Sequence, residues 1–203
     1  MALCNSPTTI EVFTCATRVN RDDVPLFNVF TVGETLSPVR ARAGLKIDPD
    51  FSLENHPEID CLIVPGGAVS AELEKQNVLE WIAKQALTTT ITASVCTGAF
   101  LLTAAGIMEG KSATTHWEDV TDLRAMFPWL FVKEGARWVD EDEIVTSAGI
   151  SAGIDMSLHL VEWLNNREQV NSSISSRLTK FIYNVCWYVV LILVSIAIYA
   201  FLN

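Results

Sequence analysis

Short apolar runs alternate with helical spacings over residues 26–164, and this order predicts a parallel sheet with crossover helices. The apolar runs predict strands at residues 26–32, 60–64 and 91–95, followed by a strand pair at 137–140 and 143–147. Apolar positions that recur every three or four residues predict helices at 78–86, 118–127 and 154–164. The fold class is therefore α/β, in one domain over residues 1–168.

The end of the chain follows a different pattern. Residues 181–202 contain no charged side chain, and a helix of 22 residues at about 1.5 Å per residue crosses a hydrocarbon layer of about 30 Å. Arg177 and Lys180 flank only its N-terminal side, so the positive-inside rule places the domain in the cytosol. We expect a single-pass membrane helix at 181–202, preceded by a polar linker that begins near Asn165 and includes residues 169–180.

The apolar segment has two other possible interpretations. A buried core helix is disfavoured because helices that are apolar all round rarely reach this length in so small a domain. A removable lipid-anchor signal requires an N-terminal secretory signal, and the start of this sequence has neither a basic nor an apolar region of that kind. The membrane-spanning reading is favoured over both.

Charge and cysteine usage exclude several classes of function. All 24 acidic residues but only 12 of the 14 basic ones precede Arg177, which argues against a nucleic-acid partner. The cysteines are odd in number and lack paired spacing, which argues against a disulfide framework and a zinc site. They are Cys4, Cys15, Cys61, Cys96 and Cys186. A reducing compartment fits this pattern best.

Cys96 stands between an apolar strand and a small apolar helix that Gly106 closes. A sharp turn there would place the thiol at the carboxyl end of the sheet, and small Gly98 and Ala99 would let the helix approach the strand, as in a nucleophile elbow. The positive end of the helix dipole would stabilise the thiolate and lower the pKa of the thiol. The pattern predicts a nucleophile that is active at neutral pH.

A second candidate element is the string Val64-Pro65-Gly66-Gly67, which ends the preceding strand. Its backbone N–H groups, together with that of Thr97, could form an oxyanion hole worth about 2.7 to 4 kcal/mol per donor. Alone, a Pro-Gly-Gly string indicates only a turn, and a buried cysteine indicates only packing. Their position at two successive strand ends favours the functional reading.

Three strings carry a family resemblance: VPGG at 64–67, ASVCTGAFLLTAAGIMEGKSATTHW at 93–117 and TSAGISAGIDMSLHLVEWL at 146–164. They resemble the ThiJ/PfpI superfamily of class I glutamine-amidotransferase-like proteins, and within it the isonitrile hydratases and the amidase-like sensor domains of transcription regulators. The similarity covers residues 27–164. It implies a flavodoxin-like parallel sheet sandwiched by helices, a homodimer, a small-molecule substrate, and no metal or organic cofactor.

The resemblance also implies roles for individual residues. Cys96 is the nucleophile, Thr97 its essential neighbour, and Gly67 and Thr97 the oxyanion donors. His116 lies twenty residues after Cys96 and is either a base or thiolate partner, or a structural anchor for its segment. Asp155 belongs to a strand-to-helix loop that could face the same crevice, or it serves the first turn of its helix.

The start of the chain departs from the family pattern. Family members begin with an apolar strand and a loop whose acidic residue hydrogen-bonds the cysteine. Here Met1 precedes the helix that contains Glu11, Val12 and Phe13 by only ten residues, so we expect the first strand to be missing and Asn5 to occupy the place of the acid. Because an amide does not exchange a proton as an acid does, acid–base assistance of about 10²-fold or more would be lost.

Three functions follow from these features. The first is a membrane-anchored cysteine enzyme that hydrates an isonitrile to an N-substituted formamide. The second is a binding or sensor module that responds to oxidation of Cys96. The third is a glyoxalase or deglycase activity, which would share the nucleophile and the need for the acid.

Overall fold

The computed structural model describes residues 7–19, 26–40, 44 and 46–167. The chain divides into two compact units, the first of Met1–Pro7 and Phe30–Met156 and the second of Thr8–Val29 and Ser157–Asn203. The described part contains no helix with the length and apolar character needed to cross a membrane. Asn5, the predicted linker at 169–180 and the predicted membrane segment at 181–202 lie outside the described residues.

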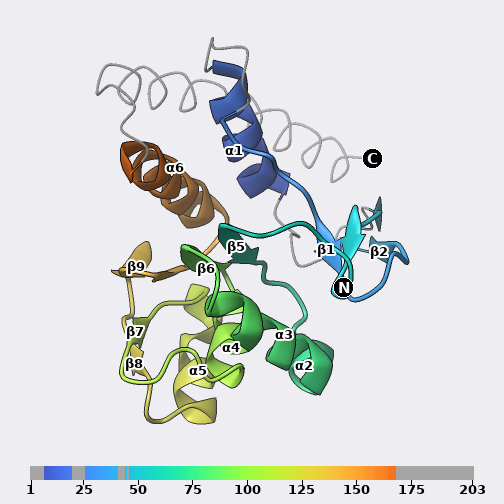
Figure 1. The fold of residues 1–203 in the computed structure, drawn as a ribbon. Coiled ribbons are helices and arrows are strands. Elements are labelled where there is room, and N and C mark those ends of the chain that lie inside the picture. The colour runs from blue at the N-terminus through green and yellow to red at the C-terminus, as the bar shows by residue number, and fades with distance from the viewer. Residues whose placement is uncertain (1–6, 20–25, 41–43, 45, 168–203) are drawn as a thin grey trace, which may run out of the picture. The chain divides into compact units, whose positions relative to one another are not determined.

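The first unit is built on a four-stranded sheet in the order β5-β6-β10-β9 (Figure 1). Its strands are β5 Cys61–Val64, β6 Ile91–Val95, β9 Trp138–Glu141 and β10 Ile144–Ser147. β5, β6 and β10 are parallel, and β9 is antiparallel to β10. The predicted strands at 60–64 and 91–95 and the predicted strand pair are therefore confirmed, and so is the α/β class with a parallel sheet.

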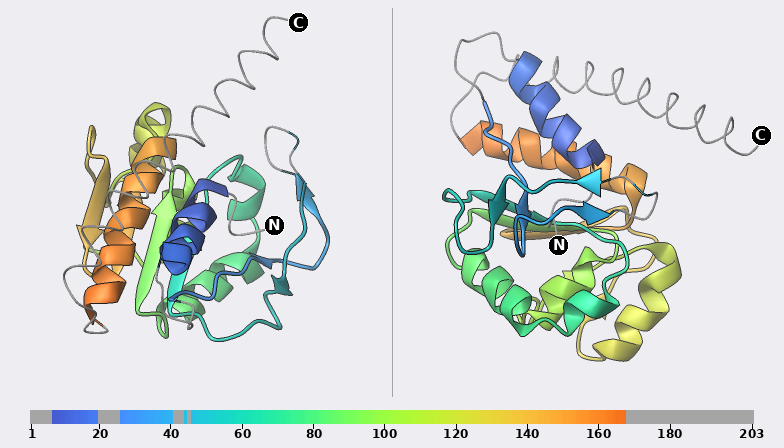
Figure 2. Two further views of the ribbon diagram at one scale, coloured as in Figure 1. Left: turned by 90° about the horizontal axis from the view of Figure 1, so that it is seen from above. Right: turned by 90° about the vertical axis from the view of Figure 1, so that its right-hand side faces the viewer.

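Helices α2 to α5 lie on the same side of this sheet (Figure 2). They are α2 Ser70–Leu73, α3 Gln76–Ala86, α4 Gly98–Ala104 and α5 Val120–Met126, which the 3₁₀ turn η1 Trp117–Asp119 precedes. The other two helices are α1 Pro7–Val19 and α6 Ile150–Arg167. The predicted helices are confirmed. The helical backbone of α6 continues to Arg167, so Asn165, where we expected the linker to begin, belongs to the helix.

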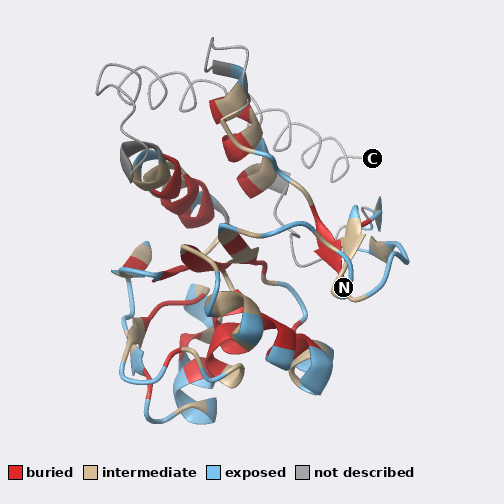
Figure 3. Cartoon of the chain, in the orientation of Figure 1, coloured by how far each residue is buried: buried red, intermediate tan, exposed pale blue. Residues whose placement is uncertain are grey.

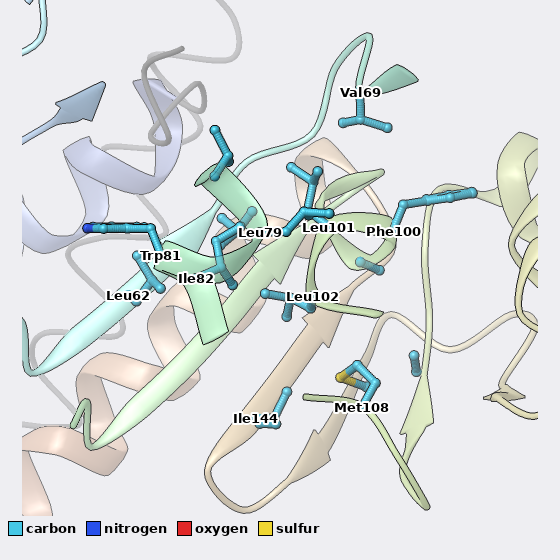
Figure 4. Packing of buried hydrophobic residues seen from close by; sticks show 14 of the residues in the cluster. Leu62, Val69, Leu79, Trp81, Ile82, Phe100, Leu101, Leu102, Met108 and Ile144 are labelled. Atoms are coloured by element: carbon cyan, nitrogen blue, oxygen red, sulfur yellow. The ribbon is translucent and has the colours of Figure 1, made fainter. Parts of the chain in front are cut away.

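The hydrophobic core of the first unit lies between the sheet and helices α3 and α4 (Figure 4). Leu62 and Ile144 are both in register with Thr92 on β6, so side chains from three neighbouring strands share one face. They pack with Ile82, Leu101, Leu102 and Met108, all fully buried. Figure 3 shows the buried stretches of α3 and α4 in red. Burial of each such side chain stabilises the fold by about 1.5 to 3 kcal/mol, and this core fixes α4 against the sheet.

Six short strands form three further pairs. They are β1 Val32–Gly33 with β4 Phe51–Ser52, β2 Val39–Arg40 with β3 Lys46–Ile47, and β7 Ser112–Ala113 with β8 Phe131–Val132. The strand predicted at 26–32 is wrong except for Val32. Thr31 donates from both its backbone N and its Oγ1 to the Asp50 carboxylate, at 2.8 and 2.7 Å, so strand pairing starts only at the next residue.

One buried hydroxyl in the sheet gives a stability prediction. Ser94 on β6 is fully buried, and its Oγ has no hydrogen-bond partner among the described residues. Because burial of an unpaired hydroxyl costs about 1 kcal/mol or more, we expect Ser94→Ala to raise the free energy of unfolding by about 0.5 to 1 kcal/mol in urea denaturation.

The matched control is Ser147→Ala on the neighbouring strand β10. Ser147 is equally buried, but its Oγ donates to Ser94 O at 3.0 Å. Loss of this bond should lower the free energy of unfolding by about 1 kcal/mol. A loss of equal size for Ser94→Ala would show that the Ser94 hydroxyl has a partner after all.

Lys75, at the N-cap of α3, joins two carboxylates in the first unit. Its Nζ donates to Glu34 Oε2 at 2.8 Å and to Glu72 Oε1 at 3.2 Å, and Asn77 Nδ2 donates to Glu34 Oε1 at 3.1 Å. The hydrogen bonds from Lys75 and Asn77 lower the pKa of Glu34. The hydrogen bond to Glu34 raises the pKa of Lys75.

These shifts predict a pH-dependent contribution to stability. A depressed pKa at Glu34 stabilises the fold above the unfolded-state pKa of about 4.3, and this contribution is lost as pH falls through the lower folded-state value. We expect Lys75→Met to lower the free energy of unfolding by about 0.5 kcal/mol at pH 7, and by much less at pH 3. Urea denaturation at both values checks this, with Lys84→Met on the same helix as the control. A pH-independent difference would contradict it.

Candidate active site

Cys96 occupies a strained turn between β6 and α4. Its φ is +56°, a left-handed backbone conformation that residues other than glycine rarely adopt and that costs about 1 to 2 kcal/mol. The helix that follows ends normally, with Gly106 at φ +80° directly after its C-cap. The predicted order of strand, turn and helix around the thiol is confirmed. The side chain of this half-buried residue is thereby turned out of the strand direction at the carboxyl end of the sheet.

Two other segments hold the backbone of Cys96 in this conformation. Its N–H donates to Ser147 O, at the end of β10, over 2.9 Å. Its C=O accepts from Thr115 Oγ1, beyond β7, also over 2.9 Å. Because both peptide groups of the turn are fixed by different parts of the chain, the strain is retained rather than relaxed.

The loop after β5 approaches the turn so closely that only glycine fits. A Cβ on Gly66 would lie 2.7 Å from Thr97 N and 2.8 Å from Cys96 Cβ. A Cβ on Gly98 would lie 2.3 Å from Val64 O. These distances are far below van der Waals contact, so the glycines let the ends of β5 and β6 and the start of α4 meet at one place.

Thr97 locks this loop through its side chain. Its Oγ1 accepts from Gly67 N at 2.8 Å and donates to Gly67 O at 2.9 Å, and the residue is 8% exposed. The Gly67 N–H, predicted as an oxyanion donor, is thus directed at Thr97 Oγ1 in this structure. The role of this N–H as an oxyanion donor stays a prediction. That role requires a reacting group either to share the Gly67 N–H with the Thr97 hydroxyl or to take the place of that hydroxyl.

His116 lies beside the same turn and contacts two acidic side chains. Its Nδ1 is 3.5 Å from Asp119 Oδ2 and 3.7 Å from Glu118 Oε2, and its side chain is 26% exposed. A Cβ built on Gly149 would lie 3.4 Å from its Cδ2. The neighbouring Thr115 is the residue that bonds Cys96, so the segment reaches the turn, and both readings of His116 remain compatible with its position.

A cysteine on a nucleophile elbow, with the glycine loop that follows β5 packed directly against it, is an arrangement suited to covalent thiol chemistry. The sequence profile of the DJ-1/PfpI family matches residues 2–163. The chain belongs to the DJ-1/PfpI family. The resemblance stated from the three sequence strings is therefore confirmed.

Some relatives of this chain are named as enzymes and others as transcriptional regulators. The isonitrile hydratase of Pseudomonas putida is 39% identical over 142 residues, which cover 70% of this chain and 61% of that protein. The transcriptional regulator GbdR of Pseudomonas aeruginosa is 32% identical over 130 residues, which cover 64% of this chain and 35% of that protein. The chain thus spans about three fifths of the first relative's length and about a third of the second's.

A solved DJ-1/PfpI structure has the same fold. The THiJ/PfpI family protein of Pseudomonas syringae superposes with a TM-score of 0.72 at 25% sequence identity, over 89% of this chain and 71% of that protein. The α/β arrangement described above is therefore the arrangement of the family.

Two contacts of the site were not predicted from the sequence. Thr115 had no assigned role, although its position after a buried alanine at the end of a short strand could have indicated an inward-facing hydroxyl. The carbonyl of Ser147 carries no side-chain signal, because any residue offers the same backbone oxygen. Both contacts act on the backbone of Cys96 and decide its conformation.

Proposed function

We propose that this chain is a cysteine-dependent hydratase that converts an isonitrile to an N-substituted formamide. The observation that carries the proposal is Cys96 itself, held at φ +56° at the carboxyl end of a parallel strand by bonds to Ser147 and Thr115. The 39% identity to the isonitrile hydratase of Pseudomonas putida supports the choice of substrate class.

The proposed reaction has two covalent stages. The Cys96 thiolate forms a bond to the terminal carbon of R–N≡C. This carbon takes up the proton that the thiol released, which gives the thioimidate R–N=CH–S–Cys96. Water then adds to the C=N carbon while nitrogen takes a proton. The C–S bond breaks to give R–NH–CHO, and the thiol regains its proton. The sum is isonitrile plus water to formamide.

The surrounding groups would serve these stages as follows. The N–H of Thr97, at the start of α4, would stabilise negative charge that develops on the adduct. Asp119 and Glu118 face Nδ1 of His116, which leaves Nε2 for proton exchange with the adduct or with water. His116 is the proton carrier that we propose for both stages.

A product assay tests the proposal. The full chain, purified in mild detergent, is incubated with cyclohexyl isonitrile, and N-cyclohexylformamide is measured by mass spectrometry. We expect turnover that depends on Cys96. Absence of formamide, with consumption of methylglyoxal instead, would reject the hydratase in favour of a deglycase-type activity.

A second candidate function is a ligand-binding or redox-responsive module. The similarity to GbdR favours it, since the name of that relative describes a transcriptional regulator and not an enzyme. In that case peroxide should form a sulfenic or sulfinic adduct on Cys96. Equal ligand affinity in the wild type and in Cys96→Ser, with no such adduct, would remove this role of the thiol. Turnover of the isonitrile by the wild type would exclude this as the sole function.

We further propose a flavodoxin-like strand order with helices on both faces of the sheet, and a homodimer. We also propose that residues 181–202 anchor the chain in a membrane, with the α/β domain in the cytosol. The uncharged sequence of 181–202 and the flanking Arg177 and Lys180 support the anchor. The full chain should stay in the membrane pellet after alkaline carbonate extraction. Its release into the supernatant would reject the anchor.

A further inference from the structure

Arg137 contacts the turn that supports Cys96 through its backbone, and the helix that follows this turn through its side chain. Its C=O accepts from Ala148 N at 2.9 Å, directly before β9. Its Nη2 forms an ion pair with Asp155 Oδ2, in the first turns of α6. The backbone contact thus lies within residues 147–149, which we call the support turn, and the ion pair holds the helix that follows it.

The support turn is connected directly to the nucleophile. Ser147 O accepts from Cys96 N, and Ser147 is in register with Val95, the last residue of β6. At its other end, Gly149 O accepts from Gly153 N, and a Cβ on Gly153 would lie 2.9 Å from Val95 Cγ1. A displacement of the support turn or of the start of α6 would therefore move the backbone that holds Cys96 at its positive φ.

We propose that the Arg137–Asp155 ion pair is a positioning element for Cys96, because it clamps the support turn between β9 and α6. Asp155 is 14% exposed on its side chain, whereas Arg137 is 60% exposed. A pair that is open to solvent on one side contributes little to global stability, so a local effect on the turn is the expected consequence of its loss. The sequence alone allows Asp155 to be either a site residue or a residue that serves the first turn of its own helix. The structure adds its partner, Arg137, directly before β9.

The test compares the rates of two cysteines in the same molecule. Iodoacetamide labelling of the full chain is followed by mass spectrometry of the peptides that contain Cys96 and Cys61. Both residues are half-buried cysteines, but Cys61 lies at the start of β5. We expect Arg137→Gln and Asp155→Asn each to slow labelling of Cys96 about tenfold, because displacement of the thiol from the start of α4 weakens the stabilisation of its thiolate, the form that reacts. Labelling of Cys61 should not change.

Two further variants separate positioning from general loosening. Arg137→Lys keeps the cation and should restore the Cys96 rate to within about threefold of the wild type. Arg124→Gln removes a comparable exposed ion pair, with Glu134 at 3.0 Å, between α5 and the end of β8, and should leave the Cys96 rate unchanged. The isonitrile assay adds a second readout that rests on the proposed function. There, kcat should fall with Arg137→Gln while KM stays constant.

Each outcome decides the inference. Unchanged Cys96 labelling in the two neutral variants, or a parallel change at Cys61, would overturn it. If the wild type forms no formamide, the proposed function fails and the labelling rates alone decide the positioning role. If the neutral variants do not fold, the double reversal Arg137→Asp with Asp155→Arg replaces them. A folded reversal that labels Cys96 within about threefold of the wild type supports the proposal, whereas a slower or unfolded one overturns it.

Discussion

Replacement of Cys96 by serine is expected to lower isonitrile turnover by at least about 10³-fold, because a hydroxyl at neutral pH is a far weaker nucleophile than a thiolate. The turn itself should persist, since its geometry depends on the backbone bonds to Ser147 and Thr115 rather than on the sulfur. The free energy of unfolding should therefore change by less than about 0.5 kcal/mol. The measurement is kcat/KM from formamide production, with urea denaturation alongside.

Cys61→Ser is the matched control for this experiment. Cys61 is another half-buried cysteine of the first unit, but it lies at the start of a strand, away from the carboxyl ends where the elbow lies. We expect its replacement to leave kcat/KM within about twofold of the wild type. Residual turnover in Cys96→Ser of more than a tenth of the wild-type value would exclude covalent catalysis by this thiol.

Gly98→Ala is expected to cause the largest loss of stability among single substitutions near the site. The added Cβ would lie 2.3 Å from Val64 O and 3.0 Å from Pro65 O, and neither backbone atom can move without displacing the end of β5. Overpacking of this kind costs about 3 kcal/mol, and the helix propensity of alanine offsets at most about 1 kcal/mol of it. The net loss in the free energy of unfolding should be about 2 kcal/mol or more, measured by urea denaturation.

The control for this prediction is Gly149→Ala. There the added Cβ would meet only the His116 ring, at 3.4 Å, which is an ordinary contact with a side chain. Its effect on the free energy of unfolding should stay within about 0.5 kcal/mol. Equal losses in both variants would mean that β5 and α4 do not approach each other as closely as described.

Those parts of the fold that depend on local pattern could be predicted from the sequence. The apolar run at 91–95 followed by Cys96, Gly98 and Ala99 predicts a strand, a sharp turn and a helix, because only small residues permit so close an approach. The strand predicted at 26–31 failed for a non-local reason. The Asp50 carboxylate takes the hydrogen bonds of Thr31, and no pattern within the segment reveals that partner.

The contacts that hold the site in place could not be predicted from the sequence alone either. Thr115 and Ser147 meet Cys96 only because β10 lies beside β6, and Arg137 reaches Asp155 only because β9 pairs with β10. Such contacts join residues that are distant in sequence through ordinary backbone oxygens and common side chains. The nucleophile could be identified from its neighbours in the chain, whereas its restraints required the fold.

The most direct test of the account is the relative reactivity of the described cysteines at pH 7, measured by iodoacetamide labelling and peptide mass spectrometry. Cys96 should react at least about tenfold faster than Cys61, because it directly precedes the N-terminal end of α4, where the positive end of the helix dipole stabilises a thiolate. Cys15 should be slowest, since burial and the charge of Glu11 raise the pKa of its thiol. A Cys96 rate equal to or below that of Cys61 would contradict the account.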